Sequence, residues 1–178
     1  MKINIVSVVL LYLLSTTTVE AAVYMKIGDI KGESTDTDHK DWIDVLSVDW
    51  GILHQRTTGN ARRRGSVIVE DINCTKKLDK STPKLIEAVA SGQVFTKAMV
   101  EFDRVVSDST GGSRREVYYR YELTNVLVSS YSVSHSDGQP GTEVVSLSFE
   151  VIDGTYVENV RATGGNVETT WKVEKGTK

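Results

Sequence analysis

Apolar and polar residues alternate along most of the chain after residue 21. The stretch "AVYMKIG" at residues 22–28 places most of its apolar side chains on every second position. Successive side chains of a β-strand point to opposite faces, so this period of two predicts a strand with one buried face. Further segments of strand character lie at residues 66–75, 94–106, 116–133, 143–157 and 167–174. The pattern therefore predicts a mostly β chain.

A second alternating segment, "WIDVLSVDWGILHQR", begins at residue 42. Its even-numbered positions carry an apolar set, namely Trp42, Leu46, Val48, Trp50 and Ile52. Ser47 and Asp49 fall on the opposite face of the same strand. We therefore predict one apolar face and one face that is at least partly wet.

The connections between these segments are rich in turn-forming residues. "SDSTGGSRR" at residues 107–115 and "SHSDGQPGT" at residues 134–142 supply the Gly, Ser, Asp and Pro that hairpin turns require. The sequence shows no internal repeat, low-complexity tract or linker. Residues 22–178 are therefore expected to form a single domain, and consecutive strands with turn-rich connections indicate a β-barrel or a β-sandwich.

Residues 79–93 have the pattern of a short α-helix instead. Ser81 or Thr82 is a suitable N-cap, and Pro83 fits the first helical position. Gly92 fits the left-handed position that ends a helix. The predicted apolar stripe consists of Leu85, Ile86 and Val89. Two or three turns are not stable alone, so the helix must dock on the sheet, where it plugs one mouth of a barrel or covers an edge.

Residues 1–21 have the three-part pattern of a secretory signal peptide. Lys2 is followed by a mostly apolar run at residues 3–14 and by the small-residue pattern "VEA" at residues 19–21. The run is shorter than the roughly 20 apolar residues that span a bilayer. The alternative is a start codon assigned too early in front of a cytoplasmic protein, but the next methionine, Met25, would begin the chain inside the first strand.

Charge and cysteine content exclude several classes of protein. The chain has 21 basic and 24 acidic residues, a net charge of −3, so it lacks the broad cationic surface of a nucleic-acid-binding protein. Cys74 is the single cysteine, which excludes an intramolecular disulfide and a cysteine-based zinc cluster. Because Cys74 lies in a predicted strand, we expect it to be a small buried apolar residue.

No catalytic motif stands out in the sequence. His39, His54 and His135 are scattered, and none has a second histidine or cysteine at metal-ligand spacing. The stretch "DTDH" at residues 36–39 could hold a cation, but it lacks the glycine and the distant glutamate of a calcium loop, so a solvated loop is favoured. Serine elbows and phosphate-binding glycine loops are also missing. We expect no cofactor and no enzymatic activity; a hydrolase whose catalytic residues assemble only in space is the alternative.

Four stretches together resemble the haemolysin-coregulated protein (Hcp) family of type VI secretion systems. They read "AVYMKIGDIKGEST", "H..WIDVLSVDWG", "DINCTKKLDKSTPKLIEAVASGQ" and "YELTNVLVSS". The resemblance extends from residue 22 to about residue 157, and its most specific part pairs "KIGDIKGES" with "DKSTP" before the helix. It implies a two-sheet β-barrel with one short α-helix packed against it, assembling as a hexameric ring.

The resemblance also implies a function and the residues that serve it. Rings of the family stack head to tail into the inner tube of a contractile injection machine, which carries secreted effectors in its lumen and works with a spike protein, a sheath and a baseplate. Ser47 and Asp49 match the strand that faces the lumen. The loop "RTTGNARRRGS" at residues 56–66 matches the family's extended loop to the neighbouring ring, and its candidate stacking residues are Arg56, Asn60, Arg62, Arg63 and Arg64. An ordinary solvated loop is the alternative for these residues.

The N-terminal segment departs from this family pattern. Family members start near "AVYMKIG" and lack an export signal, because the machine assembles from the cytoplasm and secretes the subunit itself. A signal peptide that is used would instead deliver the chain to the periplasm. The alternative function is therefore a Sec-exported periplasmic or secreted Hcp-like binding module that is not part of the tube.

Overall fold

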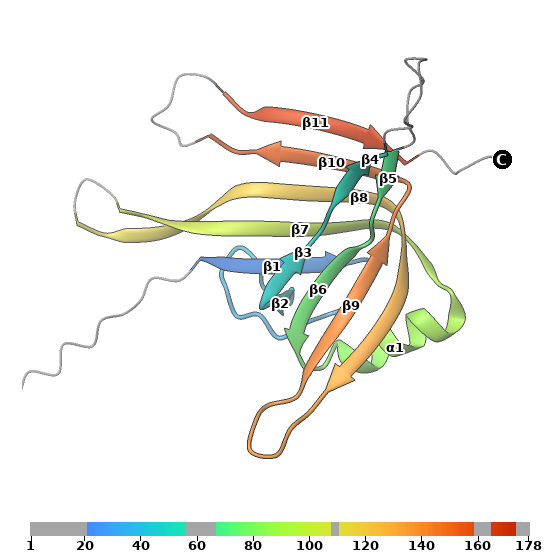
Figure 1. Ribbon diagram of the computed structural model, residues 1–178. Coiled ribbons are helices and arrows are strands. Elements are labelled where there is room, and N and C mark those ends of the chain that lie inside the picture. The colour runs from blue at the N-terminus through green and yellow to red at the C-terminus, as the bar shows by residue number, and fades with distance from the viewer. Residues whose placement is uncertain (1–20, 56–66, 108–110, 159–164, 174–178) are drawn as a thin grey trace, which may run out of the picture.

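The computed structural model describes residues 21–55, 67–107, 111–158 and 165–173. Within these ranges the chain forms strands and one helix, as predicted (Figure 1). The strands are β1 (Ala22–Ile27), β2 (Ile43–Val45), β3 (Ser47–Asp49), β4 (Ile52–His54), β5 (Val67–Val69), β6 (Ile72–Lys77), β7 (Val94–Ser107), β8 (Ser113–Ser134), β9 (Thr142–Ser148), β10 (Val151–Tyr156) and β11 (Val167–Lys172). The helix is α1 (Thr82–Ser91).

The main sheet is antiparallel, with the strand order β2-β1-β7-β8-β9-β6-β3. β8 pairs with β7 along one edge, while its other edge pairs first with β10 and then with β9. The sheet therefore divides into two layers that share β8. The first contains β2, β1, β7, β10 and β11, and the second, which contains β9, β6 and β3, crosses it obliquely (Figure 1).

β8 bends where its partner changes. Pairing with β10 ends at Thr124 and pairing with β9 begins at Leu127. Asn125, between them, has a φ of 52°, a left-handed conformation that asparagine tolerates better than most residues. Its side-chain Nδ2 donates a hydrogen bond to Glu150 Oε2 at 2.8 Å, in the connection between β9 and β10. One asparagine thus helps to turn a long strand from one layer into the other.

The hydrophobic core lies between the two layers. Met25 and Leu123 from the first layer are fully buried, as are Ile72 and Leu147 from the second. Cys74 is buried in the same cluster, as predicted. Burying side chains of this size contributes about 1.5–3 kcal/mol each, so the core accounts for the docking of one layer on the other.

The helix begins after Ser81 and ends at Gly92, which has the predicted left-handed conformation, with a φ of 63°. Ser81 makes no capping bond to the helix; its hydroxyl donates to Asp79 Oδ1 at 2.5 Å instead. Leu85 is fully buried where α1 packs against β8. Ile86 is 45% exposed, so its placement in the apolar stripe was wrong. The buried face consists of Thr82, Leu85 and Ala88.

The segment at residues 42–56 does not form one strand. β2 pairs with β1 in the first layer and β3 pairs with β6 in the second, with Leu46 alone between them. The buried positions therefore change from odd-numbered to even-numbered residues. Ile43 and Val45 are buried before the crossing, and Val48 is partly buried after it. The prediction of a single apolar face was wrong at Leu46, which is 54% exposed, because the chain crosses between layers there.

Ile52 is the second exception in this segment. It begins β4, which pairs only with β5 in a separate two-stranded ladder, and it is 46% exposed. Ile52 is therefore not part of the core face that the sequence pattern predicted.

The predicted two-sheet β-barrel is corrected to an open sheet folded on itself. β2 and β3 lie at opposite ends of the hydrogen-bonded order and do not pair with each other across the described ranges. Both contain three residues, and each pairs with a different strand, β2 with β1 and β3 with β6. None of the helices in the described residues is long and apolar enough to cross a membrane. The predicted signal peptide at residues 1–21 lies outside the described residues, apart from Ala21.

Candidate functional site

The outer face of the second layer is a polar surface built by strand register. Ser47 of β3 lies opposite Thr75 of β6, which lies opposite Val144 of β9. Asp49 lies opposite Asn73 in the same way. Residues directly opposite each other in an antiparallel pair share a face. Each row of residues that runs across neighbouring strands can therefore be assigned to one face of the sheet.

We call this surface the polar sheet face. Its members from β3, β6, β9 and β8 are Ser47, Asp49, Asn73, Thr75, Lys77, Thr142, Val144, Ser146, Ser130, Ser132 and Ser134. The intervening residues, such as Cys74 and Val145, point into the core. The polar sheet face is therefore the wet side of a layer whose other side is apolar, as the alternation of residues predicted for Ser47 and Asp49.

Hydrogen bonds hold the small side chains of this face together. Ser130 Oγ lies 2.7 Å from Ser146 Oγ, which donates to Asn73 Oδ1 at 2.6 Å. At the end of these strands, Ser129 Oγ donates to Asp71 Oδ2 at 2.5 Å. The chain of hydroxyl and amide groups across β8, β9 and β6 makes a surface that exchanges hydrogen bonds with water or a partner through short, ordered side chains.

The charges of the polar sheet face are few. Among its eleven members only Asp49 and Lys77 are charged, and Asp49 is exposed. Histidine, cysteine and glutamate do not occur among these eleven positions, so the face consists mainly of hydroxyl and amide groups.

The five candidate stacking residues lie outside the described residues, in the segment 56–66. The described strands on either side of that segment, β4 and β5, pair with each other, with His54 opposite Val67 and Ile52 opposite Val69. Leu53 and Ile68, also a pair in this ladder, are 55% and 38% exposed. The base of the loop therefore displays apolar surface, which the sequence analysis did not identify.

Two buried charged clusters were also missed. In the first, Lys76 is fully buried and its Nζ donates to Glu143 Oε1 at 2.5 Å.

The second buried cluster contains His39, which is only 1% exposed, so the prediction of a solvated loop at residues 36–39 was wrong for this residue. Glu101 and Asp103 of β7 face it across the fold. Burial raises the pKa of Asp103, and the charges of Asp36 and Glu101 raise it further, while His39 and Arg115 oppose them.

Comparison with known proteins identifies the family. The family model described as "Type VI secretion system effector, Hcp" matches residues 24–156. Protein hcp1 of Pseudomonas aeruginosa is 34% identical over 158 residues, which cover 85% of this chain and 94% of that protein.

Solved structures share the fold. A structure titled as a type six secretion system protein has a TM-score of 0.75 and 26% identity, covering 86% of this chain and 96% of that one. Hcp1 from Salmonella typhimurium has a TM-score of 0.67 and 29% identity, covering 85% and 94%. Sequence and fold agree over nearly the same length, and the chain therefore belongs to the Hcp family of type VI secretion system proteins.

Proposed function

We propose that this chain is a structural subunit of the inner tube of a type VI secretion system. Six copies form a ring, and rings stack head to tail. The observation that carries the proposal is the family match over residues 24–156, together with an overall fold similar to that of Hcp1 from Salmonella typhimurium. A ring needs two different complementary surfaces on each subunit, because its interface is heterologous.

In this proposal the polar sheet face lines the channel of the ring. A wall of serine, threonine and asparagine side chains stays hydrated and gives a passing protein few apolar contacts. Asp49, the last residue of β3, adds a negative charge to this face in each subunit. Six such charges would select among effectors through complementarity of charge, which acts on specificity more than on affinity.

The loop at residues 56–66 is proposed to contact the neighbouring ring. Arginine side chains make charge-assisted, bidentate hydrogen bonds with carboxylates, so Arg62, Arg63 and Arg64 are suited to an acidic partner surface. Exposed ion pairs contribute little individually, about 0–1 kcal/mol, so stacking depends on their repetition around the ring. Arg56 and Asn60 are proposed to assist at the start of the loop.

The partners and location follow from this role. We infer that the subunit binds secreted effectors in its lumen, a spike protein at the tube tip, and sheath and baseplate components, and that it has no catalytic activity. It assembles in the cytoplasm and leaves the cell through the machine. Disrupting the sheath should abolish its appearance in the culture medium, and undiminished export would contradict the proposal.

The predicted signal peptide motivates the alternative route. Sec export would remove residues 1–21 and deliver the chain to the periplasm, whereas the family match favours the tube. N-terminal sequencing of the native protein separates the two. An intact Met1 supports the tube, and a chain that begins at Ala22 supports an exported binding module.

A further inference from the structure

A buried charged cluster lies where the loop after β1 folds back against β7. The His39 cluster, as we name it, consists of His39, Asp36, Glu101 and Asp103. The side chains of His39, Asp103 and Glu101 are 2%, 3% and 6% exposed, and that of Asp36 is 22% exposed. Three carboxylates therefore surround one histidine, and Asp36 is the most exposed of the four side chains.

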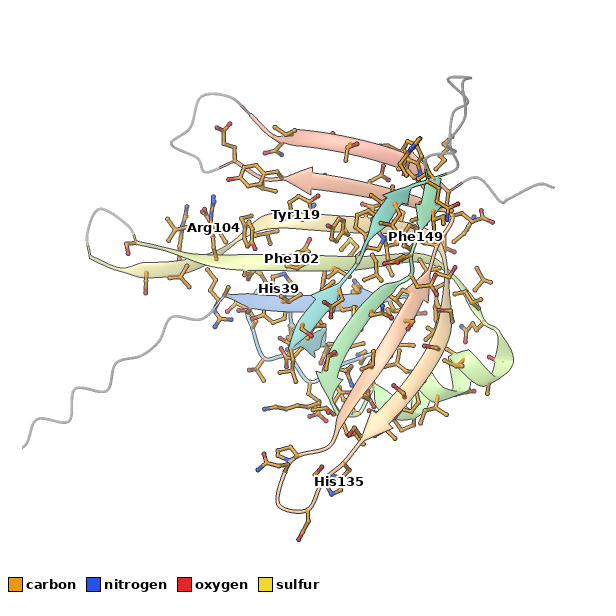
Figure 2. The ribbon with its side chains drawn as sticks, viewed as in Figure 1. His39, Phe102, Arg104, Tyr119, His135 and Phe149 are labelled. Carbon is orange, nitrogen blue, oxygen red and sulfur yellow. The ribbon has the colours of Figure 1, made fainter. Side chains whose placement is uncertain are left out.

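The imidazole ring is held in one orientation. It stacks on Tyr24 of β1, with ring centroids 4.1 Å apart and an angle of 8° between the planes. Trp42 packs against it edge-on, at 4.9 Å between centroids. Figure 2 labels His39 beside β1. A ring packed on two sides cannot turn to change which nitrogen faces which carboxylate, so each nitrogen has fixed neighbours.

The Nε2 nitrogen has a carboxylate partner of its own. Nε2 lies 2.7 Å from Glu101 Oε2, and the other oxygen of Glu101 accepts a hydrogen bond from Arg120. The carboxylate oxygen of Glu101 is therefore placed as an acceptor to which Nε2–H can donate. In the neutral imidazole the lone pair is then on Nδ1.

The Nδ1 nitrogen faces two further acceptors. Asp36 Oδ1 lies 3.1 Å from Nδ1, and Asp103 Oδ2 lies 3.7 Å from it. Asp103 Oδ1 is buried and has no hydrogen-bond partner within the described part of the chain. A nitrogen lone pair and two carboxylates thus converge, and their candidate ligand atoms all lie within 4.8 Å of one another. An arrangement of acceptors around one point is what a cation requires.

We propose that His39 Nδ1, Asp36 and Asp103 form a binding site for a divalent transition-metal ion of the Zn²⁺ type. Ligand atoms at about 2.1 Å from zinc in a tetrahedral arrangement lie about 3.4 Å from one another, close to the two distances at Nδ1. The nitrogen ligand disfavours Ca²⁺ and Mg²⁺, which prefer oxygen. Glu101 acts as the outer carboxylate that holds Nε2–H and orients the ring, an arrangement typical of metal-binding histidines.

The role of the ion in this proposal is structural. Asp36 and His39 belong to the loop between β1 and β2, and Asp103 belongs to β7, so the ion ties that loop to the first layer of the sheet. Two carboxylate charges balance the two charges of the ion. Because Asp36 is partly exposed, water from that side would supply the fourth ligand.

The test uses the full chain, stripped of metal with a chelator and titrated with ZnCl₂ by calorimetry. We expect saturable binding of one zinc ion per chain. Asp103→Asn and His39→Gln should abolish it, and Glu101→Gln should weaken it by about 10–100-fold, as for other outer carboxylates. Zinc at about 100 times its Kd should raise Tm by roughly 5–10 °C. MgCl₂ should leave Tm unchanged.

His135→Gln provides the matched control, because His135 lies exposed in the β8–β9 connection, far from the cluster (Figure 2). Zinc binding that survives in Asp103→Asn, or that disappears in His135→Gln, would overturn the proposal, as would the absence of saturable binding. A Tm that depends on pH but not on zinc would mean that the cluster holds a proton instead, which also overturns it. Asp36→Asn, at the solvent-facing rim, serves as the test variant if Asp103→Asn does not fold. Binding is measured per chain, so the result does not depend on whether rings form.

Discussion

Lys76 Nζ lies 2.5 Å from Glu143 Oε1, and both side chains are completely buried. The same Nζ donates to Asp79 Oδ1 at 2.8 Å. Glu143 in turn accepts hydrogen bonds from Thr82 Oγ1 at 3.0 Å and from the Tyr131 hydroxyl at 2.9 Å. The pair therefore joins the end of β6, the start of β9, the end of β8 and the beginning of the helix at one point.

Glu143→Ala should destabilise the protein by about 3–5 kcal/mol, because it leaves the ammonium of Lys76 buried without its closest partner. Glu87→Ala provides the control: it removes an ion pair with Lys84 whose two side chains are 67% and 63% exposed, and it should cost less than about 1 kcal/mol. Chemical denaturation measures both. Equal losses of unfolding free energy in the two variants would show that the buried Lys76–Glu143 pair contributes no more to stability than an exposed pair.

Leu85→Ala should cost about 2–5 kcal/mol in unfolding free energy, since Leu85 is the largest fully buried side chain of the helix, which packs on β8. Ile86→Ala, one position along, should change it by no more than about 0.5 kcal/mol because that side chain is largely exposed. Guanidinium titration of the two variants is the measurement. A larger effect at Ile86 would mean that the helix docks on a different face.

Cys74 should not react with thiol reagents in the native protein at pH 8. Burial, followed by the charge of Asp49, raises the pKa of its thiol to about 12, so the reactive thiolate is absent well above neutral pH. Ellman's reagent should label Cys74 rapidly in the guanidinium-unfolded chain and should not label it in the native protein. Prompt labelling of the folded protein would show that β6 opens readily at this position.

Asp49→Arg should leave stability unchanged and alter which effectors are retained, because Asp49 is an exposed charge on the polar sheet face. Asp137→Arg is the matched control, with the same change of charge in the exposed β8–β9 connection. Co-purification of effectors with each variant is the measurement. If the two variants retain the same set as the unaltered protein, Asp49 does not line the channel.

The alternation of residues predicted the longest strands of the sheet well. β1, β7 and β8 lie close to the predicted ranges. The prediction failed at Leu46, where the chain crosses from one layer to the other. The crossing moves the buried side chains from odd-numbered to even-numbered positions, and no residue near Leu46 signals it. The helix ends were readable from Pro83 and Gly92, but the buried face was not, since it depends on where β8 passes beneath the helix.

The buried charges could not have been predicted from nearby residues. His39 meets Glu101 across 62 positions of sequence, and Lys76 meets Glu143 across 67. Nothing near His39 or Lys76 distinguishes them from exposed charged residues, because burial is decided by the pairing of strands far apart in the chain. Ser47 and Asp49, in contrast, lie on an exposed face as predicted, since strand alternation alone decides it.

Light scattering coupled to size exclusion, on purified protein across a wide concentration range, tests the central claim most directly. The account predicts a particle with the mass of six chains. Averaged electron micrographs of the same fraction should show a hollow centre. A species with the mass of one chain at every concentration would contradict it.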